Sequence, residues 1–255
     1  MTGSTHLTGS TDLTGSTDLT GSTALVTGAT SGIGRAAAGL LARRGAHVLI
    51  SGRDAARGEA AVAAIRVAGG KADFIAADLG DRDSVRALAR RAAELGGGHV
   101  DILVNNAGVF PFGPTPGASD ADIDLVYDVN VKAPFILVGE LAPAMAARGN
   151  GAIVNVLTMV AQFGVAGMAL YGSSKAALTL LTKAWAAEFG PSGVRVNAVS
   201  PGPTRTEGTA GMGDQLDQLA SMATAGARPP PRRSPAPSPT WPATRPASST
   251  GPSST

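Results

Sequence analysis

From Ala24 onward, short apolar runs alternate with longer Ala-rich stretches of helical periodicity. The apolar runs read ALVTG, HVLIS, DFIAAD, DILVNN, AIVNVL and RVNAVSPG in chain order. Helices are predicted between them over about 33–44, 54–68, 82–94, 121–146 and 171–189. Continuous apolar runs separated by helices indicate a parallel sheet that is covered on both faces. The predicted fold class is α/β, a doubly wound parallel sheet whose ligands bind at the carboxyl ends of the strands.

A hexamer repeat precedes this pattern. Residues 2–25 read TGSTHL, TGSTDL, TGSTDL and TGSTAL, with a single apolar residue at the end of each copy. That period matches neither a helix nor a solenoid, so residues 1–22 are predicted to be a disordered leader. Its simplest interpretation is a repeat expansion without function. The folded domain is predicted to span residues 23–227.

The last 28 residues, 228–255, have a different composition. They hold nine of the 17 prolines and four arginines, and they contain no acidic residue and no Leu, Ile, Val, Phe, Met or Tyr. Such a segment lacks the apolar side chains needed for a core. It is predicted to be disordered, and two interpretations are open: a genuine extension, or a frameshifted reading of a sequence that belongs to the fold.

The frameshift hypothesis rests on the spacing of residues that another frame would make apolar. If the original frame began one nucleotide earlier, TCN serine codons and the tryptophan codon would encode apolar residues. Those at Ser234, Ser238 and Trp241 have helical spacing, and those between Ser248 and Ser254 cluster as in a strand. We therefore expect the chain as written to have weak activity and poor oligomerisation. Stop codons in that frame after about Ala225 would exclude the hypothesis.

Composition and charge limit the other classes of function. The chain is 44% apolar and 16% charged, as expected for one globular domain. Its net charge is +2, but without the four arginines of the tail 17 basic residues face 19 acidic ones. Residues 1–227 therefore carry a net charge of −2, and no nucleic-acid partner is expected. The chain has no cysteine, which excludes disulfides and thiol catalysis.

Neither a metal site nor a membrane segment is expected. The three histidines, His6, His47 and His99, are too scattered for a metal site or a catalytic triad. The N-terminus lacks the pattern of a signal peptide. The most apolar stretch, AIVNVLTMVAQFGVAGMALYG, is interrupted by Asn155 and Gln162 and reads as a buried strand followed by a loop. The protein is therefore predicted to be cytoplasmic, with no membrane partner.

A glycine-rich turn follows the first predicted strand. The sequence TGATSGIG places Gly28, Gly32 and Gly34 where a strand gives way to a helix. Glycines at these positions allow a tight turn and let backbone N–H groups approach a pyrophosphate, whose charge is favoured at a helix N-terminus. The strand–turn–helix context makes this a predicted dinucleotide site.

The end of the second strand bears on the choice of cofactor. A cofactor with a free ribose 2′-hydroxyl calls for an acidic residue there, but Gly52 and Arg53 occupy the place. Arg35 adds a cation in the first turn of the first helix, where only a nearby anion such as a 2′-phosphate would offset the unfavourable macrodipole. NADP(H) is therefore favoured over NAD. The alternative is two ordinary surface arginines, with Asp54 capping the next helix.

The sequence YGSSK contains the candidate acid and base. Tyr171 and Lys175 are four residues apart and would share one face of a helix. An ammonium group beside a phenol stabilises the phenolate, so Tyr171 is predicted to exchange a proton with a carbonyl oxygen near neutral pH. This spacing alone is a weak signal, since many surface helices carry it.

Four motifs together resemble one family. TGATSGIG, NNAG at 105–108, YGSSK and PG at 201–202, in that order, are similar to the classical short-chain dehydrogenase/reductase family over about residues 23–211. The resemblance implies a Rossmann-type sheet in a single domain. It implies Tyr171 as proton donor, Lys175 as the residue that binds the nicotinamide ribose and lowers the pKa of the tyrosine, and Asn130 as the helix residue that holds a relay water. Thr158 is at the position where the family usually has serine. Threonine keeps the hydroxyl, but its side chain is stiffer at χ1. The alternative interpretation is that Thr158 is a strand residue packed in the core.

The same resemblance implies a cofactor site with Asp78 at the adenine, Asn105 and Ala107 along the adenosine ribose, and Thr204 near the nicotinamide amide. The full predicted set is Thr27, Gly28, Ser31, Gly32, Ile33, Gly34, Arg35, Arg53, Asp78, Asn105, Ala107, Gly108, Tyr171, Lys175, Pro201, Gly202 and Thr204. Substrate walls are expected from 109–114, 160–170 and the segment after Pro203. These loops are apolar and Gly-rich, which suits a hydrophobic ketone or alcohol.

The sequence thus predicts an NADP(H)-dependent oxidoreductase that interconverts a ketone or aldehyde and an alcohol, with Tyr171 as acid and base. The alternative is an NADPH-binding regulatory protein without turnover. The family resemblance also implies a homo-oligomer, whose assembly the tail is expected to impair.

Overall fold

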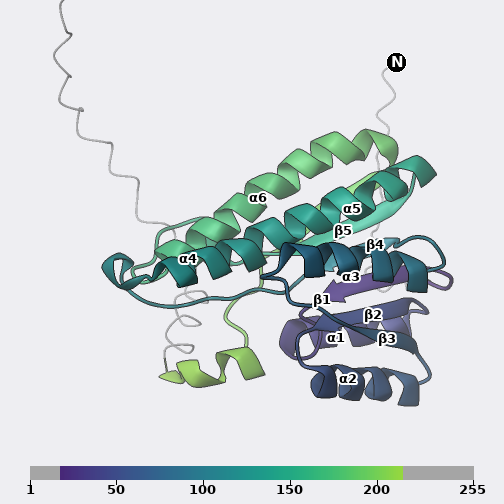
Figure 1. Ribbon diagram of the computed structural model, residues 1–255, viewed down its shortest axis with the longest axis horizontal. Helices are drawn as coiled ribbons and strands as arrows, with labels where there is room; N and C mark the ends of the chain where they lie inside the picture. The colour runs from purple at the N-terminus through teal and green to yellow at the C-terminus, as the bar shows by residue number, and fades with distance from the viewer. Residues whose placement is uncertain (1–17, 215–255) are drawn as a thin grey trace, which may run out of the picture.

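A six-stranded parallel sheet forms the centre of the protein, whose residues 18–214 are described by a computed structural model (Figure 1). The strand order is β3-β2-β1-β4-β5-β6. The strands are β1 (Thr23–Thr27), β2 (His47–Gly52), β3 (Lys71–Ala76), β4 (Ile102–Asn105), β5 (Gly151–Val156) and β6 (Val194–Val199). The predicted doubly wound parallel sheet is confirmed.

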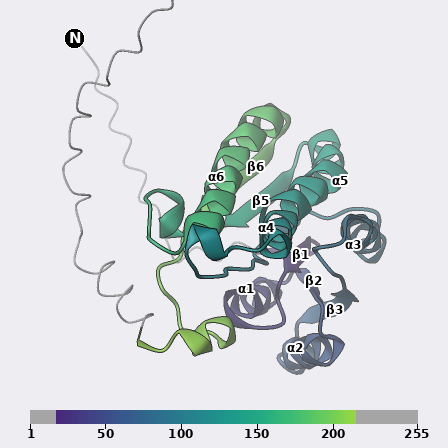
Figure 2. The same cartoon turned by 60° about the vertical axis from the view of Figure 1, so that its left-hand side comes forward.

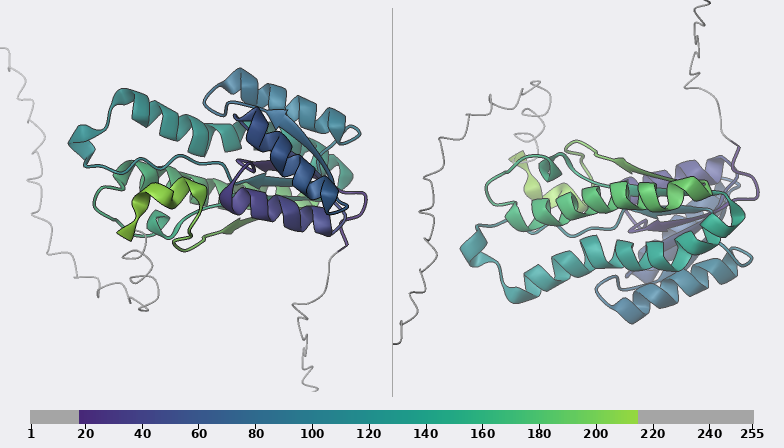
Figure 3. Two further views of the ribbon diagram at one scale, coloured as in Figure 1. Left: turned by 90° about the horizontal axis from the view of Figure 1, so that it is seen from below. Right: turned by 90° about the horizontal axis from the view of Figure 1, so that it is seen from above.

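Helices cover the sheet in two layers. On one face lie α1 (Gly32–Arg43) and α2 (Ala55–Val67). On the other lie α3 (Arg82–Leu95), α4 (Asp120–Tyr127), α5 (Ala133–Arg148) and α6 (Ala169–Phe189). Figure 2 shows α1 and α2 on one side of the strands and α3 and α5 on the other, and Figure 3 shows α3, α5 and α6 side by side. Short 3-10 turns lie at 115–117, 159–161, 190–192 and 207–212.

The central strands are buried on both faces. Leu25 and Val26 are adjacent in β1, and alternation of side chains sends them to opposite cores, where each has no exposed surface. Leu49 and Ile50 divide in the same way in β2. This double burial explains why the strands read as continuous apolar runs rather than as an alternating pattern.

The sheet is less covered at β6. Val194 and Val196 point into the core beneath α5 and α6, whereas Asn197 and Val199 point to the opposite face and are exposed. Within residues 18–214, β6 is also one of the two edge strands of the sheet, with β3 at the other edge. The predicted tail at 228–255 and the frameshift hypothesis lie outside the described residues.

The single helix predicted over 121–146 is interrupted. A π-helical turn at Asp128–Lys132 separates α4 from α5. Pro134 supplies the physical reason: it has no N–H, so the α-helical hydrogen bond to the carbonyl of Asn130 cannot form. By length and composition the whole run Asp120–Arg148 would suffice to cross a membrane, but here it packs against α3 and α6 as a core helix.

The last residues assigned to the leader contact the domain. The N–H of Leu19 donates to the carbonyl of Arg44 at 2.7 Å, and the carbonyl of Ser22 accepts from the N–H of His47 at 2.9 Å. Leu19 also packs against the core next to α1. Asp18–Ser22 therefore extend the folded domain, and the predicted boundary at residue 22 lies too far along the chain. Residues 1–17 lie outside the described part.

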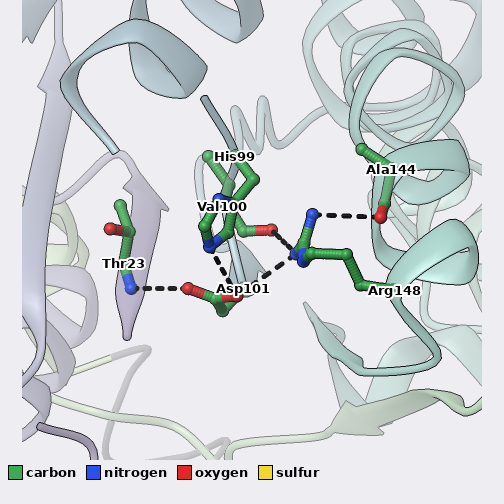
Figure 4. A network of polar contacts seen from close by, with 6 residues as sticks. All are labelled: Thr23, His99, Val100, Asp101, Ala144 and Arg148. Atoms are coloured by element: carbon green, nitrogen blue, oxygen red, sulfur yellow. Dashed lines mark hydrogen bonds and ion pairs between the residues drawn. The ribbon is translucent and has the colours of Figure 1, made fainter. Parts of the chain in front are cut away.

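Asp101 joins the amino ends of β1 and β4 to the carboxyl end of α5 (Figure 4). Its carboxylate accepts from the N–H of Thr23 at 2.8 Å and from Nη2 of Arg148 at 3.2 Å, and lies 3.3 Å from Nε2 of His99. Arg148 also donates to the carbonyls of Val100 and Ala144. The network fixes the start of β1 beside the start of β4, at the end of the sheet opposite the ligand-binding edge.

We expect Asp101→Ala to destabilise the domain by about 1–3 kcal/mol, because it leaves the buried Thr23 N–H without its acceptor and Arg148 without its partner. Asp101→Asn keeps an acceptor oxygen and should lose about half as much. Urea unfolding followed by circular dichroism measures both. Asp124→Ala, on the exposed face of α4, is the control and should change stability by less than about 0.5 kcal/mol. Equal stability of Asp101→Ala and wild type would contradict the role of this network.

Candidate active site and cofactor groove

A groove opens at the carboxyl ends of β1 to β4, where the strand order reverses between β1 and β4. This switch point is where doubly wound sheets bind ligands. Of the predicted residues, the groove is lined by Gly28, Ser31, Gly32, Ile33, Arg53, Asp78, Ala107 and Gly108. Thr30, Ser51, Arg57, Leu79 and Asn106 also line it and were not predicted.

The glycine-rich turn has the conformation that its sequence requires. Gly28 and Gly32 have φ angles of +62° and +53°, which favour glycine. A Cβ on Gly28 would lie 2.8 Å from Cα of Ala107, so a larger residue there would separate the turn from β4. A Cβ on Gly34 would collide with the side chain of Asn106. Gly34 thus allows close packing below the groove rather than lining it.

Thr27 and Asn106 hold the two sides of the groove together. Nδ2 of Asn106 donates to the carbonyls of Thr27 and Gly28 at 2.9 and 3.0 Å. Oγ1 of Thr27 accepts from the N–H groups of Asn106 and Ala107, both at 3.1 Å. Thr27 is buried and does not reach the groove surface. We therefore assign it a positioning role instead of the predicted direct contact.

Asn105 does not lie where the sequence analysis placed it. Its side chain is buried, and Nδ2 donates to Oδ1 of Asn155 at 2.9 Å, while Nδ2 of Asn155 donates to Oγ1 of Thr182 at 2.8 Å. This chain of hydrogen bonds runs through the core from β4 to α6. The next residue, Asn106, lines the groove instead. A strand alternates its side chains, and sequence alone did not show which asparagine faces outward.

The positive charges of the groove come from Arg53 and Arg57. Arg35 borders an adjoining cleft between α1 and the segment 204–207, so the predicted pair Arg35 and Arg53 is separated. Asp54 caps α2, as the alternative interpretation held: its carboxylate accepts from the N–H of Arg57 and pairs with its Nε at 2.8 Å. Arg57 carried the same sequence signal as Arg35, a cation in the first turn of a helix.

Tyr171, Thr158 and Lys175 come together where the groove meets a second, apolar cavity of about 220 Å³. Tyr171 and Lys175 lie in the first turns of α6, and Thr158 follows β5. Nζ of Lys175 donates to the carbonyl of Val156 at 2.9 Å and is almost fully buried. Pro201, Gly202 and Thr204 line the same cavity. Three of the four predicted catalytic residues, Thr158, Tyr171 and Lys175, therefore lie together at this cavity.

Burial shifts the ionisation of both groups on α6. Burial lowers the pKa of Lys175 from 10.5 to about 8, because the charged form loses its hydration. Burial raises the pKa of Tyr171, and the hydrogen bond with the hydroxyl of Thr158 partly offsets that rise. The expected lowering of the tyrosine pKa by Lys175 is not found in this geometry. The ammonium group is directed to the carbonyl of Val156, and desolvation dominates.

Asn130 lies in the π-helical turn and is completely buried. Its side-chain amide pairs with both backbone groups of Val109, accepting from the N–H and donating to the carbonyl, each at 2.9 Å. It also donates to Oγ of Ser174 at 3.0 Å. The side chain thus fixes the loop after β4 against α6, and the backbone at Asn130 departs from α-helical geometry.

The apolar cavity beside Tyr171 includes residues from each of the predicted substrate walls and several neighbours of those walls. Its walls include Phe110, Met159, Val160, Met168 and Pro203. The ring of Phe110 meets the ring of Tyr171 edge-on, with centroids 6.0 Å apart. Phe110 lines both the cavity and the groove, so it lies at their junction. No acidic side chain lines this cavity within the described residues, which suits a neutral, apolar ligand.

The groove fits a dinucleotide on structural grounds. Gly28 and Gly32, both with left-handed φ angles, form the turn into the N-terminus of α1, and a helix N-terminus favours a pyrophosphate. Oγ of Ser51, buried at the end of β2 and lining the groove, has no hydrogen-bond partner among the described residues. A buried hydroxyl without a partner is costly and indicates a ligand with polar atoms at this point.

Comparisons with known proteins agree with this geometry. The family model described as short chain dehydrogenase matches residues 22–217. The 3beta-hydroxysteroid dehydrogenase of Mediterraneibacter gnavus is 42% identical over 183 residues, which are 71% of this chain and 66% of that protein. A solved structure of a short chain dehydrogenase/reductase family protein is 51% identical, with a TM-score of 0.72, and the match covers 81% of this chain and 82% of that one.

A second solved structure, of a metagenomic short-chain oxidoreductase in complex with NADP, is 38% identical with a TM-score of 0.71. That match covers 82% of this chain and 93% of that one. Sequence and fold similarity therefore extend together over most of the described residues. The chain belongs to the short-chain dehydrogenase/reductase family of NAD(P)-dependent oxidoreductases.

Proposed function

We propose that this protein is an NADP(H)-dependent oxidoreductase that interconverts a hydrophobic ketone or aldehyde and the corresponding alcohol. The observation that carries the proposal is the meeting of Tyr171, Thr158 and Lys175 at the junction of a dinucleotide groove and an apolar cavity. A bound nicotinamide would supply or accept the hydride at the carbonyl carbon, and Tyr171 would exchange the proton with the carbonyl oxygen.

The residues of the candidate site have distinct roles in this proposal. Tyr171 is protonated at neutral pH, as an ordinary phenol is, and burial raises its pKa further, so it holds a proton that a carbonyl oxygen can accept. The hydroxyl of Thr158 donates a second hydrogen bond to that oxygen. Lys175 holds a positive charge beneath the site, and Asn130 positions the loop that carries Phe110. Gly28, Gly32 and Ile33 would hold the pyrophosphate, and Asp78 and Ala107 would contact the adenosine.

Preference for NADP(H) is supported by Arg53 and Arg57 at the far end of the groove, where an acidic residue would serve NAD. The related metagenomic oxidoreductase has NADP bound. A guanidinium group forms bidentate, charge-assisted hydrogen bonds with a phosphate. We therefore place the 2′-phosphate of the cofactor between these two arginines.

The substrate is proposed from the cavity walls. Apolar side chains, among them Phe110, Met159, Val160, Met168 and Pro203, line the cavity together with Tyr171 and Thr158, which favours an alicyclic or aromatic ketone over a charged one. The 3beta-hydroxysteroid dehydrogenase relative acts, by its name, on a hydroxyl of a fused alicyclic ring system. We retain the expectations of a cytoplasmic enzyme, of a homo-oligomer, and of no nucleic-acid or membrane partner as parts of this proposal.

We expect Tyr171→Phe to lower kcat by about 10²–10⁴-fold, since the ring remains and only the acid is lost. The Kd for NADPH, measured by quenching of protein fluorescence, should change by less than about threefold. The assay is NADPH oxidation against a panel of alicyclic and aromatic ketones. An active Tyr171→Phe enzyme would exclude the mechanism. Binding of NADPH by wild type without oxidation against any ketone would favour the regulatory alternative.

Arg53→Ala should raise the Kd for NADPH by about 10- to 100-fold and leave the Kd for NADH nearly unchanged, because only NADPH has a 2′-phosphate. Titration of each cofactor into each protein measures this. Arg90→Ala removes the same charge from an exposed position on α3 and is the matched control. A wild-type protein with higher kcat/KM for NADH than for NADPH would contradict the assignment.

The buried Lys175 predicts the pH dependence of reduction. Because its pKa is lowered to about 8, the ammonium group is present below that pH and is lost as pH rises through 8. Tyr171 stays protonated over this range, since its pKa is raised. We therefore expect kcat/KM to fall above about pH 8. Lys175→Arg stays charged at these pH values, so the activity that it retains should not fall above about pH 8. A fall of kcat/KM at the same pH in this variant would show that another group causes it.

A further inference from the structure

The segment Thr204–Met212 lies beside α1, far along the chain from the glycine-rich turn (Figure 2). Its threonines 204, 206 and 209 line the apolar cavity, and Thr206 also lines the cofactor groove. A Cβ on Gly32 would lie 3.2 Å from the side chain of Thr206, which shows how closely the segment packs on the turn. Reciprocal hydrogen bonds between Thr206 and Thr209 give the segment a defined start.

Glu207 places a carboxylate on the glycine-rich turn. Its Oε2 accepts from the N–H of Gly32, the first residue of α1, at 3.1 Å. The side chain is exposed, and its pKa is lowered by hydrogen bonds from its own N–H and from that of Gly32 and by the positive charges of Arg35 and Arg57. A lowered pKa means that the group is an anion at neutral pH.

The carboxylate of Glu207 occupies the position where the pyrophosphate of the cofactor is expected to bind. The first N–H groups of a helix have no partner within the helix and carry the positive end of its dipole. In the proposed function they receive the pyrophosphate. Glu207 satisfies one of them and faces the cations nearest to it. A carboxylate and a pyrophosphate at this turn would repel each other.

We propose that Glu207 is an internal anionic competitor for the cofactor, which must leave the N–H of Gly32 before the pyrophosphate can occupy the turn. The inference rests on the proposed function, because the competing ligand is the cofactor of that function. A molecule in which Glu207 contacts Gly32 does not bind the cofactor. The apparent affinity therefore falls in proportion to the fraction of molecules that make this contact. The same segment also walls the apolar cavity, through Thr204, Thr206 and Thr209.

Glu207→Gln tests the charge separately from the shape, because glutamine keeps the size and an acceptor oxygen. We expect this variant to bind NADPH about three- to tenfold more tightly than wild type at low ionic strength. The advantage should shrink toward zero at about 0.5 M salt, since exposed charges are screened. Glu207→Ala should show the same tightening. Isothermal titration of NADPH into the full-length proteins gives each Kd without any turnover.

Glu188→Gln is the matched control, since it makes the same change of charge at an exposed site near the end of α6. It should bind NADPH as wild type does. Equal or weaker binding by Glu207→Gln would overturn the inference, and so would tightening by the alanine variant alone, which would assign the effect to bulk rather than charge. If neither wild type nor any variant bound NADPH or NADH, the proposed function itself would be overturned, and this inference with it.

Discussion

The hydrogen bonds between Thr27 and the turn at Asn106 and Ala107 are the contact on which the site depends. They bind the end of β1 to the end of β4, the two strands between which the sheet reverses its order. The groove exists because chains leave these neighbouring strands in opposite directions. Gly28 and Gly34 are small because this contact brings the two turns so close together. At the other end of the same strands, Asp101 holds them in register.

The chemistry of the site follows from burying polar groups beside that groove. Lys175 and Asn130 lie in the interior, and each is held by backbone atoms: Val156 for the lysine and Val109 for the asparagine. Such bonds compensate for lost hydration and fix the position of Tyr171 relative to the loop after β4. Pro134 contributes by interrupting the helix so that Asn130 can face this loop.

The charged side chains lie at two separate places along the groove. Arg53 and Arg57 stand at the end expected for the adenosine, and Asp54 partly neutralises Arg57 while capping α2. Glu207 and Arg35 stand at the glycine-rich turn. In the proposed function the cations attract the cofactor at one end of the groove, and in the proposed competition the carboxylate limits access to the glycine-rich turn. The two proposals together would link affinity for the cofactor to the segment that walls the apolar cavity.

Local patterns in the sequence determined the strands, the helices, the doubly wound sheet, the glycine-rich turn and the shared face of Tyr171 and Lys175. Each of these depends on residues near one another in the chain, so spacing and propensity suffice to predict it. The family resemblance added Asn130 and Thr158, which no local rule selects.

Only the tertiary structure decided which of two adjacent asparagines faces the groove, that Arg57 rather than Arg35 lines it, and that Glu207 meets Gly32. It also decided the direction of the pKa shifts, since burial of Tyr171 and Lys175 is a property of the whole packed domain. Such facts depend on side-chain direction and on contacts between residues up to 175 positions apart. A one-dimensional pattern does not contain them, because they arise only when distant elements pack together.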